Sequence, residues 1–175
     1  ELIRETLQGN KSALSELYNR YNKFIYNLCL KMMYCPLDSA DASQEIWIKA
    51  ITHLNSFEFR SKFNTWLYRI AVNHILNLNK TKMESAISNG FTSYGPGMDS
   101  IIDEDLNIED KLVYDELVEE AKFSCIMGML LCLNRDQRMA FVLGEVFGFD
   151  HKTGSALMDI SEDNFRQKLS RARKD

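Results

Sequence analysis

The sequence predicts an all-α fold in which two small helical domains are joined by a flexible acidic linker. Apolar residues recur at the three-and-four spacing of amphipathic helices in both halves of the chain, and Val, Ile and Thr never alternate with polar residues as they do in strands. Between 86 and 111 that spacing stops, and Ser, Gly, Asn and Asp become frequent. We therefore expect an amino-terminal domain over 1–85, a linker over 86–111 and a carboxy-terminal domain over 112–175.

Three helices with short connections are expected in the amino-terminal domain, which predicts one compact bundle. The first spans about 13–33, with Asn10 as a candidate N-cap and Pro36 ending it. The second spans about 39–54. The third begins at Phe63, and its packing face combines residues at helical spacing, namely Phe63, Trp66, Leu67, Ile70, Ala71, His74 and Leu78.

The carboxy-terminal domain ends in a helix-turn-helix pattern. The segments expected before and within it are helices over 112–133 and 135–147, a turn at 148–150, and two short helices over 151–158 and 162–174. Ser161 is placed to cap the last helix. The apolar residues expected to hold the two short helices together are Ala156, Leu157, Ile160, Phe165, Leu169 and Ala172.

Charge is unevenly distributed along the chain. The formal net charge of −4 disfavours phosphate binding if it is taken as a single number. Residues 1–85, however, carry 11 Lys and Arg against 8 Asp and Glu, residues 86–133 carry 2 against 10, and residues 134–175 carry 8 against 7. Two weakly basic ends therefore flank an acidic connector.

The cysteines and histidines do not indicate a metal or redox site. The 4 cysteines form no C-x-x-C pair and the 3 histidines stand far apart, whereas a zinc site needs closer ligand spacing. We expect neither a metal nor another cofactor. Buried, reduced thiols in a cytoplasmic protein are expected at Cys29, Cys125 and Cys132.

The sequence indicates neither an enzyme nor a membrane span. It has no phosphate-binding Gly loop and no nucleophile with a base at a recognisable spacing. A calcium loop beginning at Asp103 is excluded because Ile108 and Tyr114 stand where it needs Gly and Glu. The longest apolar run, 125–133, has 9 residues, against about 20 for a membrane helix. The first residues also lack the apolar segment of a signal peptide.

Two features between 57 and 80 suggest contact with single-stranded nucleic acid. The loop over 57–62 interleaves aromatic and cationic side chains, which can stack on unpaired bases and hold the phosphate backbone. The helix that follows carries polar residues opposite its packing face. The candidate contacts are Phe57, Arg60, Lys62, Asn73, Asn77 and Lys80. The alternative is that aromatics at this spacing only pack in the core, as we expect of Trp66 and Ile70.

The last helix has the composition of a helix that reads duplex DNA. Its outward residues include Arg, Asn and Gln, which form paired hydrogen bonds to guanine and adenine edges, and further cations that suit phosphates. The candidate contacts are Asn164, Arg166, Gln167, Lys168, Arg171 and Arg173. The alternative is a solvated basic face at a chain end.

Three segments resemble parts of a single family. They are DASQEIWIKA at 41–50, FNTWLYRIAVN at 63–73 and DQRMAFVLGEVFGFDHKTGSALMDISEDNFRQKLSRARK at 136–174. They are similar, in that order, to the polymerase-docking segment, the minus-ten segment and the minus-thirty-five domain of the extracytoplasmic-function (ECF) group of bacterial RNA polymerase sigma factors. One departure is Glu162 and Asp163, where relatives usually carry small or hydroxyl residues at the start of the recognition helix.

The resemblance implies a sigma factor that binds core RNA polymerase and directs promoter recognition, promoter melting and transcription initiation. It implies contacts with the β′ clamp helices and the β subunit, with promoter DNA, and with an anti-sigma factor such as many relatives have. The resemblance assigns the minus-ten element to the candidate single-strand contacts and the minus-thirty-five element to the candidate duplex contacts. The residues implied in docking on the clamp helices are Asp41, Gln44, Glu45, Trp47 and Lys49.

Two alternatives remain open at this point. One is a helix-turn-helix regulator that binds duplex DNA without joining polymerase, which leaves the loop over 57–62 unexplained. The other is a helical interaction module whose apolar surfaces bind a regulatory protein.

Overall fold

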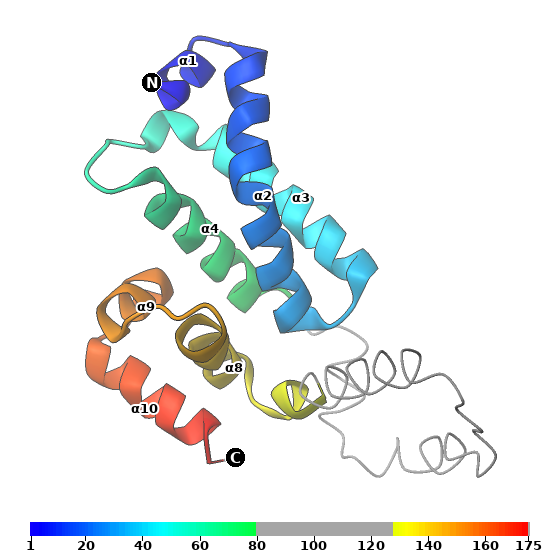
Figure 1. Ribbon diagram of the computed structural model, residues 1–175, viewed down its shortest axis with the longest axis vertical. Helices are drawn as coiled ribbons and strands as arrows, with labels where there is room; N and C mark the ends of the chain where they lie inside the picture. Colours follow the sequence, from blue (N-terminus) through cyan, green and yellow to red (C-terminus); the bar gives the residue numbers. More distant parts are fainter. Residues whose placement is uncertain (80–127, 175) are drawn as a thin grey trace, which may run out of the picture.

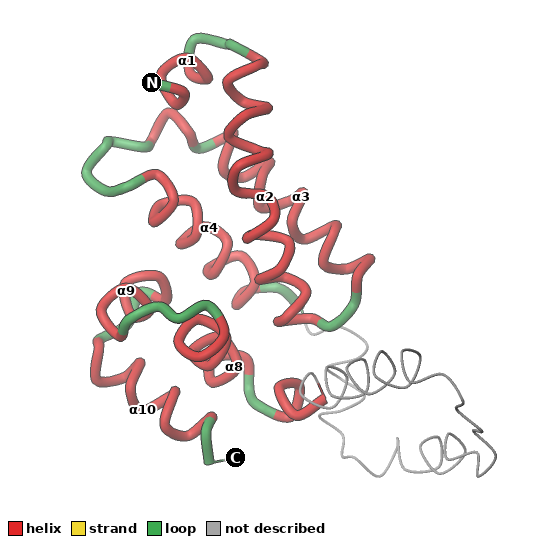
Figure 2. Tube along the Cα trace, viewed as in Figure 1, coloured by secondary structure: helices red, strands yellow, loops and turns green. Residues whose placement is uncertain are grey.

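The computed structural model describes residues 1–79 and 128–174. Within these two ranges every regular element is a helix, which confirms the predicted all-α fold (Figures 1 and 2). The predicted linker over 86–111, most of the predicted helix over 112–133, and the residues Lys80 and Cys125 lie outside the described residues.

The amino-terminal half contains the three predicted helices and one that was missed. They are α1 Leu2–Leu7, α2 Lys11–Met33, α3 Pro36–Thr52 and α4 Phe63–Asn77, with a short 3-10 turn, η1 Leu54–Ser56, between the last two. The missed α1 has only 6 residues and no buried one. Periodicity cannot reveal a helix of fewer than two turns.

The ends of α2 and α3 follow from their terminal residues. Asn10 caps α2 as predicted, since its side-chain oxygen accepts hydrogen bonds from the backbone N–H groups of Ser12 and Ala13. Tyr34, in the left-handed conformation with φ of 53°, ends α2. Pro36 is the first residue of α3, where its missing N–H costs nothing, so α3 begins three residues before the predicted start at 39.

The carboxy-terminal half ends in the predicted helix-turn-helix. Its described elements are α8 Arg135–Phe141, a π-helical turn η3 Val142–Val146, α9 His151–Met158 and α10 Glu162–Ala172. Gly148, with φ of +68°, makes the predicted turn between η3 and α9. Ser161 caps α10 as predicted by accepting from the N–H of Asn164.

The two halves pack against each other. Figure 1 shows α8 and α9 beside α4, with α10 at the end of the molecule away from α1. The Phe24 ring on α2 stacks on Tyr68 of α4 at 3.9 Å and lies 4.6 Å from Phe147. Buried Arg138 donates to the carbonyl oxygen of Met32, at the end of α2. Arg135 donates to backbone carbonyls at the end of α4.

Two burial expectations need correction. Ala156 is exposed on α9, whereas its neighbours Gly154 and Leu157 are buried, and Gly154 lies against Phe165 of α10. Cys132 is exposed, whereas Cys29 is buried as predicted. Burial raises the pKa of the Cys29 thiol to about 12, so this group stays protonated and unreactive.

Candidate nucleic-acid interfaces

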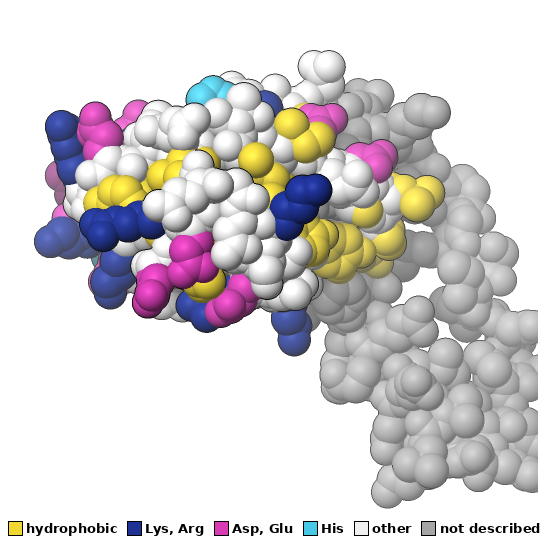
Figure 3. Space-filling view, turned by 90° about the horizontal axis from the view of Figure 1, so that it is seen from above, with side chains coloured by type: hydrophobic (Ala, Val, Ile, Leu, Met, Phe, Trp, Pro, Cys, Tyr) yellow, Lys and Arg dark blue, Asp and Glu magenta, His cyan; other side chains and the backbone are white. Residues whose placement is uncertain are grey.

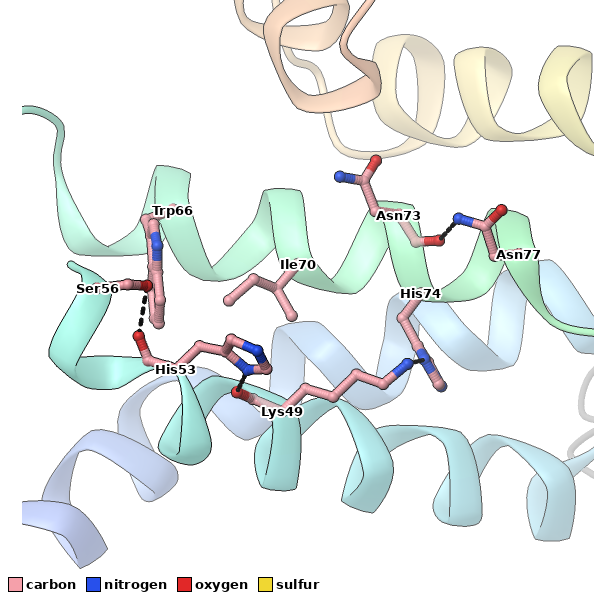
Figure 4. Close-up of a pocket in the computed structure, with 8 residues that line it drawn as sticks. All are labelled: Lys49, His53, Ser56, Trp66, Ile70, Asn73, His74 and Asn77. Atoms are coloured by element: carbon pink, nitrogen blue, oxygen red, sulfur yellow. Dashed lines mark hydrogen bonds between the residues drawn. The ribbon is translucent and has the colours of Figure 1, made fainter.

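A groove of about 360 Å³ lies between α3 and α4 (Figure 4). This volume falls in the range of about 300–1,000 Å³ that small-molecule sites occupy. Its lining residues are Lys49, His53, Ser56, Trp66, Ile70, Asn73, His74 and Asn77. Two of the predicted strand contacts, Asn73 and Asn77, therefore border the groove, whose aromatic wall is Trp66.

The two asparagines lie one turn apart on α4 and both are exposed. The side-chain amide of Asn77 donates to the backbone carbonyl of Asn73 at 2.8 Å. Figure 4 shows the Asn73 amide pointing away from His53 and toward the carboxy-terminal helices. The Asn73 amide can donate and accept at once, which is what recognition of a base edge requires.

A buried histidine forms the end of the groove. The side chain of His74 is 4% exposed, as its predicted place on the packing face requires. Its Nδ1 lies 2.6 Å from Lys49 Nζ, and its Nε2 lies 3.4 Å from Glu45 Oε2. Burial lowers the pKa of His74, the positive charge of Lys49 lowers it further, and Glu45 opposes both.

The loop over 57–62 presents a different aromatic from the one predicted. Phe57 is only 5% exposed and packs against Phe63 and Trp66, so its ring is unable to stack on a base and that prediction is wrong. Phe59 is 49% exposed and its ring has Arg4 of α1 above it at 5.4 Å. Its φ of 57° is a left-handed value that costs a non-glycine residue free energy.

The cations of this loop are accessible. Arg60 pairs with Glu58 at 3.0 Å, and both side chains are mainly exposed. Lys62 is exposed and occupies the N-cap position of α4. On the face seen in Figure 3, Lys and Arg side chains are interspersed with Asp and Glu and do not form one basic patch. This face therefore offers a few separate cations and no strong positive field.

The predicted docking segment on α3 presents its apolar residues differently from the prediction. Trp47, one of the residues implied in docking, is 4% exposed, packs on Tyr18 at 5.1 Å and donates from Nε1 to Asn22, so its ring is not available for contact with a partner. Ile48, by contrast, is 63% exposed. The residues that share its stripe of α3 and are also exposed are Leu37, Asp41, Gln44 and Ile51.

The second helix of the helix-turn-helix is held by one aromatic. Phe165 has no exposed surface, and its ring fills the space that a Cβ on Gly154 of α9 would occupy. Leu169 and Ala172 continue this buried face, as predicted. The opposite face of α10 is therefore turned to solvent.

The predicted duplex contacts divide into two groups. Those on the exposed face are Asn164, Arg166, Gln167 and Arg171. Lys168 is turned toward α8, where its Nζ lies 2.7 Å from Asp136, and Arg173 pairs with Glu145 of η3. Arg166 also forms an ion pair with Asp163 at 3.0 Å, so one of the two acidic residues at the start of α10 is partly neutralised.

The part of the chain that the structure describes contains no group of three or more His, Cys, Asp or Glu side chains that could hold a metal ion. None of its helices is long and apolar enough to cross a membrane.

The sequence matches two family models, and each covers one of these two surfaces. Residues 17–82 match Sigma-70 region 2, and residues 123–175 match Sigma-70, region 4. The first range contains α3, α4 and their groove, and the second contains the helix-turn-helix. The arrangement is therefore that of a Sigma-70-type transcription initiation factor.

Curated relatives narrow this class. The ECF RNA polymerase sigma-E factor of Escherichia coli (strain K12) is 30% identical over 181 residues, which cover 98% of this chain and 88% of that protein. The ECF RNA polymerase sigma factor SigW of Bacillus subtilis (strain 168) is 32% identical over 111 residues, which cover 59% of each protein. The chain belongs to the ECF group of RNA polymerase sigma factors.

Solved structures share the fold at low sequence identity. A chain in the structure of CnrH in complex with the cytosolic domain of CnrY aligns with a TM-score of 0.64 and 19% identity, covering 99% of this chain and 90% of that one. A chain in the co-crystal structure of the sigma factor RpoE with the anti-sigma factor NepR from Bartonella quintana gives 0.57 and 17%, with 92% of both chains covered.

Proposed function

We propose that this chain is a cytoplasmic, non-enzymatic specificity subunit that binds core RNA polymerase and directs promoter recognition, promoter melting and transcription initiation. The observation that carries this proposal is the presence of two different DNA-directed surfaces in one chain. One is the concave groove beside Asn73 and Asn77, and the other is the convex outer face of α10. A regulator that binds only duplex DNA has no use for the groove.

The exposed stripe of α3 is the surface that binds polymerase. In this proposal Ile48 is the apolar anchor, and Asp41 and Gln44 form its polar rim, a composition typical of the energetic centre of an interface. Trp47 supports this stripe from the buried side of α3, because its contacts with Tyr18 and Asn22 fix α3 against α2. The stripe docks on the β′ clamp helices, and other surfaces of the chain meet the β subunit.

The groove and the loop before α4 bind the melted minus-ten element. Phe59 stacks on an unpaired base, since its ring is half exposed and has the Arg4 cation beside it. Arg60 and Lys62 hold the backbone of the non-template strand, and Asn73 and Asn77 contact a base edge. Lys80, which lies outside the described residues, extends the same row of contacts. Because α9 packs against α4, a strand that approaches Asn73 from that side needs α9 to move away.

The helix α10 binds the minus-thirty-five duplex. In a helix-turn-helix the second helix enters the major groove, and Arg166, Gln167 and Arg171 are placed to reach base edges there. Lys168 and Arg173 suit phosphates once their intramolecular partners are exchanged for DNA. In this proposal 1–85 and 112–175 are separate domains and 86–111 is a tether that allows them to reach two promoter elements.

We also propose that an anti-sigma factor holds the chain inactive. Two proteins with a similar fold were solved with such a partner or with a cytosolic domain of another protein. An anti-sigma factor that covers the α3 stripe or the outer face of α10 blocks polymerase or promoter binding directly.

Reconstitution tests the proposed function. The chain is combined with core RNA polymerase and a genomic DNA library, and transcript starts are mapped. We expect a stable complex with core and a set of starts that share two conserved upstream elements. Failure to associate with core, together with direct binding to duplex DNA, would establish the helix-turn-helix regulator instead.

A further inference from the structure

Lys49 lies next to the exposed stripe of α3 around Ile48, on the side of the helix that faces α4. A helix turns 100° per residue, which places Leu37, Asp41, Gln44, Ile48 and Ile51 within one sector. Lys49 falls on the flank of that sector that faces α4, where its side chain lines the groove and meets His74 (Figure 4). Trp47 falls on the opposite flank and meets α2.

The contact between Lys49 and His74 fixes the state of the imidazole. A Lys ammonium only donates, so Nδ1, at 2.6 Å from Nζ, must accept and carries no proton. The remaining ring proton is then on Nε2, which faces Glu45 Oε2 at 3.4 Å without the geometry of a hydrogen bond. The neutral ring thus lies between two charged residues of α3. Its Nδ1 lone pair faces the Lys49 cation, and its Nε2 proton faces the Glu45 carboxylate.

We propose that Lys49 is a strand-binding residue of the groove and that His74 is the residue that positions it. This deepens the proposed function, on which it rests, and removes Lys49 from the predicted polymerase contacts. The ligand is an unpaired nucleotide of the non-template strand. One ammonium N–H is given to His74, and two remain for a phosphate oxygen or a base acceptor in the groove.

Two observations favour this role for Lys49. Among the described lining residues of the groove it is the one Lys or Arg, so it supplies the positive charge that a nucleotide there requires. A Lys side chain also loses rotamer freedom when it binds. The hydrogen bond to a buried ring restricts that freedom before the strand arrives, and preorganisation of this kind raises affinity.

The test measures binding of the holoenzyme to the non-template strand of its own mapped promoter, over a range of salt concentrations. Lys49→Met removes the charge and keeps the length of the side chain. We expect strand affinity to fall about tenfold. The slope of log K against log salt should shrink by about 0.7, the value for one lost phosphate contact to a single strand. Affinity for core polymerase should stay within twofold of wild type.

A matched pair tests His74. Leu and Asn have nearly the same shape, but only Asn places an acceptor near the position of Nδ1, so both variants lose the same packing. We expect His74→Leu to reduce strand affinity and salt slope as Lys49→Met does, and His74→Asn to restore most of both. Lys23→Met, at an exposed site on α2, is the charge control and should leave both unchanged.

Each contrary result identifies a different error. Equal losses of core affinity and strand affinity in Lys49→Met would return Lys49 to the polymerase interface. Equal binding by His74→Leu and His74→Asn would show that His74 only packs. Variants that all bind like wild type would overturn the role of Lys49 alone, whereas a wild-type chain that binds neither core nor strand would overturn the proposed function as well.

Discussion

The groove between α3 and α4 and the outer face of α10 offer DNA opposite shapes. The groove is concave, has an aromatic wall at Trp66, and contains one Lys and no Arg among its described lining residues. The face of α10 is convex and carries Arg166 and Arg171 on a regular helix. A concave site with an aromatic wall suits an unpaired base, whereas a convex cationic helix suits the major groove of a duplex.

The two surfaces also differ in how they are supported. α4 is packed by α2, α3, α8 and α9, and five of its apolar residues are buried in the core. α10 packs mainly on α8 and α9, with Leu169 also facing Gly144 of η3, and it adds three buried apolar residues, Phe165 the largest of them, to the same core. The helix that carries the proposed strand contacts is therefore packed by more helices than the helix proposed to read the duplex.

The largest effect is expected from Phe165→Ala. Removing a fully buried aromatic ring leaves a cavity and should lower the free energy of unfolding by about 3–5 kcal/mol. Urea denaturation measures this change, and duplex binding should fall more than strand binding. Leu37→Ala, at a site that is 78% exposed, is the control and should change stability by less than about 0.5 kcal/mol. Similar losses in both variants would show that α10 is not held as described.

Arg166→Ala and Arg171→Ala should weaken binding to the upstream promoter duplex by about 1–3 kcal/mol each, because a paired hydrogen bond to a base edge is lost. Gel-shift titration on matched and mismatched duplexes measures the loss and its base specificity. Arg173→Ala is the internal comparison, because Arg173 is assigned to a phosphate and its loss should weaken binding to matched and mismatched duplexes alike. Loss of base specificity in Arg173→Ala but not in Arg166→Ala would reverse the division of contacts on α10.

Asn73→Ala should impair promoter opening by about 0.5–1.5 kcal/mol, the net value of a hydrogen bond, and leave core binding unchanged. Permanganate reactivity of unpaired thymines reports opening, and anisotropy reports core binding. Asn19→Ala, an exposed site on α2, serves as the control. Equal losses of opening and core binding in Asn73→Ala would remove it from the strand-binding groove.

The smallest effect concerns pH. Burial lowers the pKa of His74 below its ordinary value of 6.5, so the unfolded chain binds the proton more readily. The stability that neutral His74 contributes is complete above that value and is lost as the pH falls below it. His74→Asn should therefore flatten the acid side of the stability profile measured by urea midpoints. His151→Asn, at an exposed residue, should not.

Periodicity and capping predicted most of the helices because both are local properties. The Asn10 and Ser161 caps and the burial of His74, Phe165 and Leu169 follow from spacing along single helices. The partners of those residues could not be predicted, since they depend on how helices cross. Lys49 lies 25 residues from His74 in sequence, and only the packing of α3 on α4 brings them together.

The candidate site was predicted in part for the same reason. Asn73 and Asn77 were found because they are polar residues one turn apart on an amphipathic helix. Phe57 and Trp47 were misplaced because an aromatic near polar residues can point inward or outward, and the neighbouring helix decides which. The exposure of Phe59 depends on a left-handed backbone at a non-glycine residue, which no local rule predicts.

The central claim is that one chain reads a melted strand with α4 and a duplex with α10. Site-specific photo-crosslinking in the open promoter complex tests it most directly, with a crosslinking residue in place of Asn77 or of Gln167. We expect position 77 to crosslink to the non-template strand within the melted region, and position 167 to crosslink to base-paired DNA at the upstream element. Crosslinks from both positions to the same DNA segment, or from position 77 only to polymerase, would contradict the claim.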